Sequence, residues 1–169
     1  MKNKVIISIF VLILFGFIIP EPRIIPVEGA TASDWDPKTF WYEPWGTSGV
    51  HKGVDIFAST GTPILAATNQ VVLYRGEIKK GGKVIVALGP KWRLHYYAHL
   101  STVNNDAGTF VSIGTPLGTV GNTGNAKGKA PHLHYSILSL LPLPWLIDGS
   151  TQGVKKALYL NPIEYFDFI

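Results

Sequence analysis

Short apolar runs separated by turn residues make up most of the chain after its first forty or so positions. The runs are rich in β-branched and aromatic residues and span 54–57, 63–67, 70–74, 83–88, 93–100, 117–120 and 132–138. Between them lie segments rich in Gly, Pro and Asn, such as 59–63, 113–116 and 121–125. Runs spaced by roughly 8–12 residues with turn signals between them are typical of all-β domains. We therefore predict a mostly β fold, a single compact antiparallel β-sheet domain.

The N-terminal residues follow a different pattern. Residues 1–4 are a short basic start, and residues 5–19 form an apolar run. A bilayer-spanning helix needs ~20 residues, so this run is closer in length to the core of a signal peptide. The Ala30-Thr31-Ala32 segment has the pattern of a cleavage site but lies far downstream. A cleaved signal peptide and an uncleaved membrane anchor therefore both remain open.

Either alternative places the rest of the chain outside the cytoplasm, because basic residues precede the apolar run. We expect export to the periplasm or cell envelope, with anchorage to the cytoplasmic membrane through residues 5–19 as one alternative. Residues 21–36 are rich in Pro, Glu, Ala, Thr and Ser, which is typical of a linker. The predicted organisation is a signal peptide or anchor over 1–20, a linker over 21–36 and one domain over 37–169.

Composition excludes several classes of function. The chain of 169 residues contains no cysteine, which excludes disulfide scaffolds, thiolate metal sites and cysteine nucleophiles. Fifteen Lys and Arg against eleven Asp and Glu give a net charge of +4. This mild basicity suits anionic surroundings such as a cell wall or membrane surface, and the lack of a Lys/Arg run argues against a nucleic-acid partner.

Two short motifs carry candidate metal ligands. His132 and His134 lie on a predicted strand, where the two-residue period directs both imidazoles to one face. Asp55 follows His51 by four positions, with Gly53 between them to let the backbone bend. Two imidazoles and one carboxylate are a common set of three zinc ligands that leaves a fourth position for water. Each motif alone is weak and fits ordinary solvent-facing side chains, but together they predict a metal site.

Several motifs in a fixed order resemble one known family, the lysostaphin-type (LytM-like) zinc metallopeptidases that cut peptidoglycan peptides. The motifs are Gly49–Ile56, Thr60–Ala66, Tyr97–Leu100, Gly121–Gly124 and Pro131–Tyr135. The resemblance covers about residues 48–138, and the closing segment 161–166 is also similar to the end of that family. It implies a compact, mostly antiparallel β domain with zinc in a groove on the sheet.

The resemblance also implies roles for individual residues. Matched motif to motif, His51, Asp55 and His134 would bind Zn²⁺, and His99 and His132 would be the catalytic pair. The implied function is a zinc-dependent endopeptidase that hydrolyses peptide cross-links or stem peptides of bacterial peptidoglycan through a zinc-activated water assisted by histidines. No H-E-x-x-H motif supplies a glutamate base, which leaves these two histidines as the best-placed groups for proton transfer.

Two other functions remain as alternatives. One is a catalytically inactive wall-binding or activator module for another hydrolase, against which the intact set of histidines argues. The other is a carboxypeptidase-type zinc enzyme of different fold, whose separate metal motif is not seen.

Two features of the sequence allow more than one interpretation. His95 shares the strand parity of His99, so it is a candidate for lining the groove. The aromatic cluster from Trp35 to Trp45 fits either core packing or a groove wall for the substrate.

Overall fold

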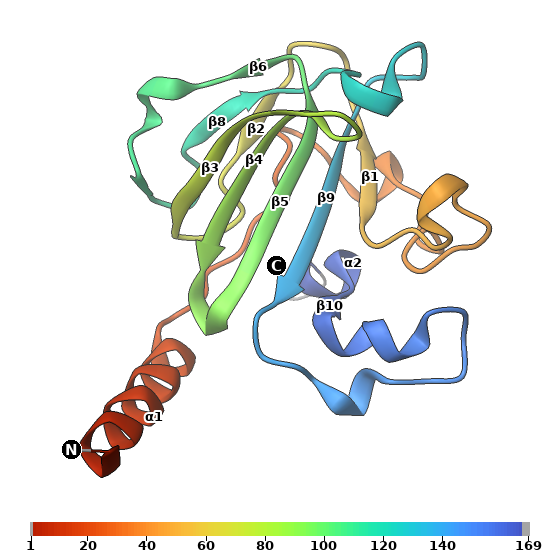
Figure 1. Cartoon of the computed structure of the whole chain (residues 1–169). Coiled ribbons are helices and arrows are strands. Elements are labelled where there is room, and N and C mark those ends of the chain that lie inside the picture. The colour runs from red at the N-terminus through yellow and green to blue at the C-terminus, as the bar shows by residue number, and fades with distance from the viewer. Residues whose placement is uncertain (1, 167–169) are drawn as a thin grey trace.

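The computed structural model describes residues 2–166. Residue 1, at the start of the expected signal or anchor segment, and residues 167–169, at the end of the expected domain, lie outside the described residues. The chain forms two antiparallel β-sheets, with an N-terminal helix that projects from one end of the domain (Figure 1). The predicted mostly β, antiparallel architecture is confirmed, with a second sheet in addition to the single one expected.

The large sheet has seven strands and the small one three. The large sheet runs in the order β1-β9-β5-β4-β3-β7, with β10 also paired to β9, and the small sheet in the order β2-β8-β6. The strands are β1 Val54–Phe57, β2 Pro63–Leu65, β3 Gln70–Ile78, β4 Gly82–Gly89, β5 Arg93–Leu100, β6 Thr102–Val103, β7 Phe110–Val111, β8 Pro116–Thr119, β9 His132–Ser139 and β10 Tyr159–Leu160. The α-helices are α1 Lys2–Ile18 and α2 Pro162–Phe166.

Within residues 2–166, seven short 3₁₀ helices occupy the connections. They are η1 Ala32–Asp34, η2 Gly46–Ser48, η3 Pro90–Trp92, η4 Asn105–Ala107, η5 Gly124–Ala126, η6 Pro144–Leu146 and η7 Gly153–Leu158. Helix η2 precedes β1, and η5 precedes β9, so both lie close in sequence to the histidine motifs.

One hydrophobic core lies between the two sheets. Ile56 and Ile85 of the large sheet and Ile64 and Leu117 of the small sheet are fully buried in the same cluster. The alternation of side chains along each strand sends one face of the large sheet into this core. The other face, along β1, β9 and β5, is therefore free to carry polar groups.

The segment for which the sequence suggests a linker packs against the domain. The Ile24 N–H donates to the carbonyl oxygen of Ala67, and the Leu65 N–H donates to that of Pro26, both at 3.0 Å. The Val27 side chain is only 2% exposed, and the buried Trp35 contacts the Phe166 ring. Residues 24–28 thus add an irregular edge to the small sheet and part of the core.

Helix α1 leaves most of its apolar side chains exposed. The Trp92 indole N–H donates to the carbonyl oxygen of Ile13 at 2.9 Å, which joins the helix to the β4–β5 turn. Among residues 2–166, no helix combines the length and the apolar character needed to cross a membrane.

Candidate metal centre

Three candidate ligands meet at the edge of the large sheet. Asp55 of β1 and His134 of β9 are directly paired in register, so their side chains lie on the same face of adjacent strands. His51 reaches them from the turn that precedes β1. His51 Nε2, Asp55 Oδ1 and His134 Nδ1 lie 2.7–3.1 Å from one another. Within the described chain this is the group that could hold a metal ion.

Neighbouring groups orient both ligand imidazoles. His51 Nδ1 lies 3.0 Å from the carbonyl oxygen of Thr39, which can only accept, so Nδ1–H donates and Nε2 faces the other two candidate ligands. His134 Nε2 lies 3.0 Å from Ser136 Oγ, which leaves Nδ1 to face the other two ligands. A side chain at Gly53 would meet Ser136 Oγ at 2.5 Å, so glycine is required there by close packing. Such hydrogen bonds fix the ring orientation of metal-binding histidines.

The sequence did not identify these two orienting residues. Ser136 follows His134 by two positions on β9, and the strand period is the signal that could have found it. Thr39 reaches His51 across a loop and has no local sequence signal.

The electrostatics of the three ligands favour a cation between them. Burial opposes ionisation of the Asp55 carboxyl, but the hydrogen bonds and charges of His134 and His51 outweigh it and hold the pKa of Asp55 well below its usual range. Burial also lowers the pKa of His134. Metal binding requires neutral imidazoles, and a carboxylate with two such rings brings lone pairs together at about 3 Å, an arrangement that a positive ion stabilises. The donor set therefore fits a divalent metal.

The two predicted catalytic histidines share one tautomer. His99 Nδ1 donates to the carbonyl oxygen of Thr123 at 2.9 Å, and His132 Nδ1 donates to that of Ala130 at 2.8 Å. The two rings lie edge to face with centroids 5.1 Å apart. His132 Nε2 is 3.9 Å from Asp55 Oδ2. Nδ1 therefore carries a proton in both rings, and each ring lies close to the ligand cluster.

A β-bulge turns His99 toward the site. Ala98 and His99 of β5 together lie opposite Val84 of β4, because the register shifts between Lys83 and Ile85. His99 has a φ of 66°, a left-handed conformation that is uncommon for residues other than glycine. Its N–H donates to the carbonyl oxygen of Gly81 at 2.8 Å. The extra residue reverses the alternation of side chains at this point, as bulges near active sites do.

His95 lies on the core side of the same strand. It is fully buried, and its Nδ1 lies 2.6 Å from the Tyr135 hydroxyl. The interpretation that His95 lines the groove with His99 is therefore wrong. The two-residue strand period does not place His95 and His99 on the same face, because the bulge lies between them. Tyr96 and Ala98 line the groove instead.

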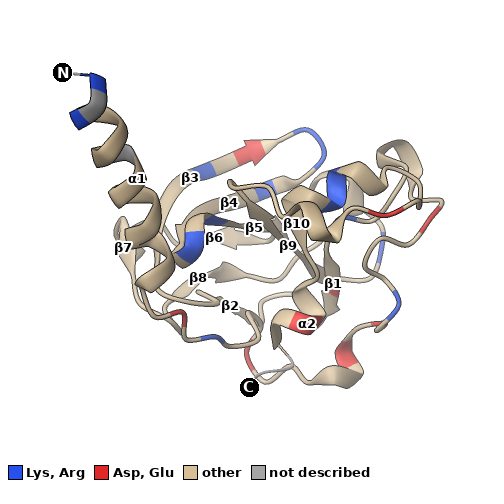
Figure 2. Ribbon diagram, turned by 90° about the horizontal axis from the view of Figure 1, so that it is seen from below, with Lys and Arg blue, Asp and Glu red and all other residues tan. Residues whose placement is uncertain are grey.

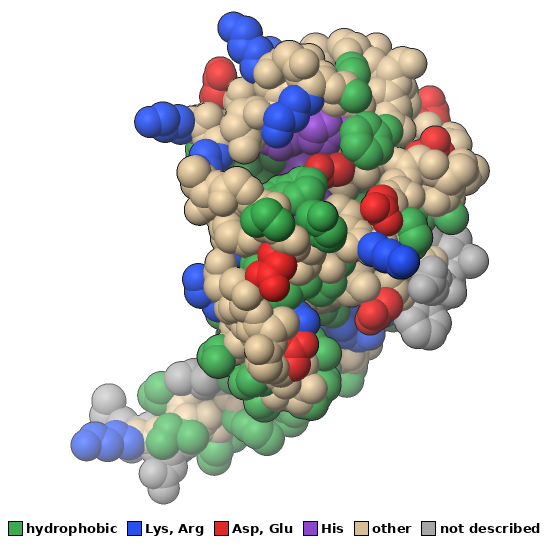
Figure 3. All heavy atoms as spheres, turned by 90° about the vertical axis from the view of Figure 1, so that its right-hand side faces the viewer, with side chains coloured by type: hydrophobic (Ala, Val, Ile, Leu, Met, Phe, Trp, Pro, Cys, Tyr) green, Lys and Arg blue, Asp and Glu red, His purple; other side chains and the backbone are tan. Residues whose placement is uncertain are grey.

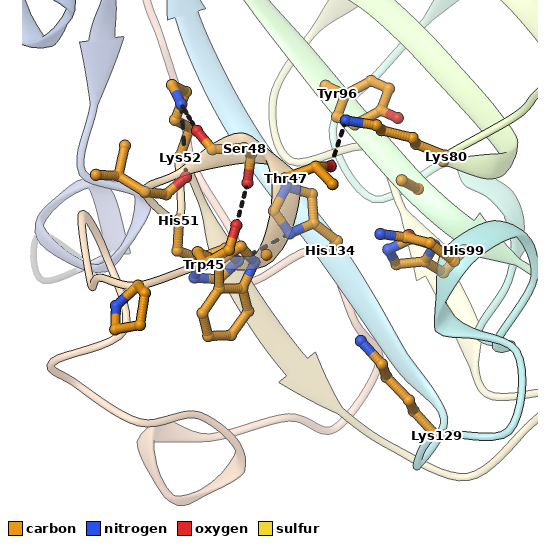
Figure 4. A pocket seen from close by; sticks show the side chains of 16 residues that line it. Trp45, Thr47, Ser48, His51, Lys52, Lys80, Tyr96, His99, Lys129 and His134 are labelled. Atoms are coloured by element: carbon orange, nitrogen blue, oxygen red, sulfur yellow. Dashed lines mark hydrogen bonds between the residues drawn. The ribbon is translucent and has the colours of Figure 1, made fainter. Parts of the chain in front are cut away.

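A cavity of about 380 Å³ opens beside the ligands. Figure 3 shows the histidines at the bottom of a hollow with basic side chains near its rim. The loop around η2 forms one wall, and His99 lies on the other (Figure 4). The Trp45 indole stacks on the His51 imidazole with ring centroids 4.1 Å apart. Trp45 is thus a groove wall, whereas Trp35 and Trp41 are buried.

Burial and, after it, the charges of His134 and His132 lower the pKa of His99 to about 4. His99 is therefore neutral at pH 7. Because its Nδ1 carries the proton, Nε2 is available to accept one.

Comparisons with known proteins agree with this geometry. The sequence profile of a family described as Peptidase family M23 matches residues 49–142. The L-Ala–D-Glu endopeptidase of Bacillus subtilis is 32% identical over 114 residues, which cover 62% of this chain and 35% of that protein. The glycyl-glycine endopeptidase ALE-1 of Staphylococcus capitis is 34% identical over 103 residues, which cover 58% of this chain and 28% of that protein. The chain thus spans about a third of the length of these relatives.

A solved structure confirms the fold. The catalytic domain of lysostaphin from Staphylococcus simulans superposes with a TM-score of 0.62 at 24% identity, covering 82% of this chain and 98% of that domain. The family match over residues 49–142 confirms the resemblance found in the sequence motifs, while the role of each site residue stays a prediction.

Proposed function

The chain belongs to peptidase family M23, and we propose from this that it is a zinc-dependent endopeptidase acting on peptide bonds of bacterial peptidoglycan. The observation that carries the proposal is the convergence of His51, Asp55 and His134 beside a cavity that His99 also lines. The names of the relatives support peptide hydrolysis as the reaction. The inactive-module alternative is not favoured, because the chain retains each residue predicted as a ligand and both histidines predicted as catalytic.

The three ligands would hold the ion through two nitrogens and one oxygen, a set that suits zinc and leaves a position open for water. When bound, zinc supplies a Lewis acid that polarises the scissile carbonyl and lowers the pKa of water. Thr39 and Ser136 keep the His51 and His134 rings in the orientation that this requires.

The remaining chemistry is proton transfer by this chain's own imidazoles. The attacking water needs a base, and the leaving amine needs an acid. In both His99 and His132 a backbone carbonyl holds a proton on Nδ1, and His99 also lines the cavity. We assign to these Nε2 atoms the acceptance of the water proton and its return to the amine. Once protonated, an imidazole beside the scissile bond also stabilises the developing oxyanion.

A direct test uses the purified full chain and purified peptidoglycan. Protein stripped with a chelator, and the same protein reloaded with zinc, are compared for release of soluble peptides, which mass spectrometry then identifies. We expect release only after reloading, with about one zinc bound per chain. A wall-binding module would instead sediment with the peptidoglycan and release nothing in either state.

We also propose that the domain works outside the cytoplasmic membrane. The support is the basic start followed by the apolar run of residues 5–19. A fusion of residues 1–40 to a reporter that is active only after export should show activity. An inactive fusion, in cells where a known signal sequence exports the same reporter, would refute this localisation.

A further inference from the structure

The wall of the cavity carries positive charge that the reaction itself does not use. Lys80, in the β3–β4 turn, and Lys129, in the loop before β9, both line it. None of its sixteen lining residues, all within the described part of the chain, is acidic. The nearby Asp55 is engaged with the ligand imidazoles. Figure 2 shows the β3–β4 turn as basic.

Lys80 is held across the cavity. Its ammonium donates to Thr47 Oγ1 of the opposite wall at 2.7 Å, as Figure 4 shows. A hydroxyl is neutral, so this bond leaves the charge uncompensated. The Lys80 carbonyl oxygen accepts from the Asn125 N–H at 2.9 Å, which joins the turn to the η5 loop. A side chain at Gly82 would meet the Gly124 nitrogen at 2.4 Å, so turn and loop are closely packed.

Lys129 points into the same space. Its ammonium lies between Trp45 and His99 in Figure 4 and has no hydrogen bond or ion pair with any described residue. The backbone below it is anchored, because the Lys129 N–H donates to the carbonyl oxygen of Ala126 at 2.9 Å. Two exposed cations with no acidic partner among the described residues therefore line the cavity that His99 also lines.

We infer that Lys80 and Lys129 bind a free carboxylate of the substrate close to the scissile bond, so that the enzyme prefers an acidic stem peptide to a neutral glycine bridge. The inference rests on the proposed peptidase function and adds a substrate class to it. Charges of one sign along the walls of a single cleft add to one another and raise the local concentration of an anion such as a carboxylate. The relatives' names cover both chemistries, since D-Glu bears a carboxylate and a glycyl-glycine bond has none beside it.

The experiment compares one wall material in two charge states. Directly cross-linked peptidoglycan is used as purified, and after its carboxylates have been converted to carboxamides with a carbodiimide and ammonia. We expect the zinc-loaded wild type to digest the untreated material about 5- to 20-fold more efficiently, the sum of two partly exposed ion pairs. The preference should shrink as salt rises.

Matched variants locate the effect. Lys80→Gln with Lys129→Gln should bring the ratio of the two efficiencies close to one. Lys79→Gln with Lys127→Gln removes the same charge from exposed neighbours that do not line the cavity, and should keep the wild-type ratio. Two peptides spanning the cleaved bond, amidated only at the C terminus or only at the internal carboxyl, then show which carboxylate is bound.

The possible outcomes distinguish this inference from the proposed peptidase function on which it rests. Equal digestion of both materials by the wild type overturns the carboxylate preference but leaves the peptidase intact. A preference that survives the double cavity variant overturns the assignment to these lysines. Digestion of neither material refutes the proposed peptidase and the inference with it.

Discussion

Strand β5 carries a buried histidine at each end, and only one of them opens onto the cavity. Burial lowers the pKa of both His95 and His99 to about 4. His99 gives Nδ1 to a backbone carbonyl and keeps Nε2 at the cavity. His95 contacts Tyr135 through Nδ1, and its Nε2 has no hydrogen-bond partner among the described residues. Burial and a shifted pKa are therefore shared by both, and only access to the cavity separates the catalytic candidate from the structural residue.

Two carboxylates, one near each end of β5, also differ in the groups that surround them. Asp55 meets imidazoles, which leaves room for a positive ion. Glu21, whose side chain is 1% exposed, instead meets the cations of Arg23, Lys91 and Arg93. Burial opposes ionisation of Glu21, but Arg93 and the other two cations hold its pKa below the usual value. One end of the sheet is therefore organised for a metal, and the other is a closed ion-pair cluster.

Removing a ligand at the candidate metal site should have the largest effect on activity. His134→Ala should lose the bound zinc and reduce wall lysis by more than about 10³-fold, because two ligands hold the ion poorly. The fold should persist, since the core lies on the other side of the sheet. Zinc content, thermal melting and lysis are measured on one preparation. Unchanged zinc content would remove the ligand assignment.

His99→Ala should separate chemistry from metal binding. Losing a proton-transfer group should cost on the order of 10²–10⁴ in rate while zinc stays bound to its three ligands. The same three measurements apply. Loss of zinc together with activity would make His99 a ligand, and near wild-type lysis would make it structural and leave His132 as the base.

Truncation of the N-terminal segment tests how much the ion-pair cluster around Glu21 and the adjoining residues contribute to stability. A chain without residues 1–32 loses Glu21 and the buried Val27, and should be less stable than one without residues 1–19 by on the order of 3–5 kcal/mol. The comparison uses the free energy of unfolding of both chains in denaturant. Equal values would show that residues 20–32 add nothing to the domain, as an ordinary linker would.

His95→Asn should reduce the acid sensitivity of folding. Because the pKa of His95 falls from 6.5 to about 4 on folding, its contribution to stability is complete above pH 6.5. As the pH falls from 6.5 to 4, the unfolded chain binds a proton that the folded one refuses, and on the order of 3 kcal/mol is lost. The free energy of unfolding is measured at pH 7 and at pH 4.5 with chelator present. Its difference between the two pH values should be smaller for the variant than for the wild type. Identical differences would contradict this account.

Local periodicity determined much of this protein in advance. The positions of the main strands follow from their apolar runs and turns, and the placement of His132 and His134 on one face follows from the strand period. The order of the motifs was enough to identify the family. These features were readable because each depends on residues that are neighbours in sequence.

Other features depend on which distant strand or loop packs against the residue concerned. His99 faces the cavity because β5 bulges against β4, and nothing within Tyr97–Leu100 reveals that register shift. Thr39 orients His51, and Trp45 covers it, from a loop whose course is set by distant contacts. Residues 21–36 have the composition of a linker, yet part of the segment is buried against the small sheet. The sequence by itself determined which residues form strands and which chemistry they carry, and only the tertiary structure decided which way each side chain faces, because a strand's register is set by partners far along the chain.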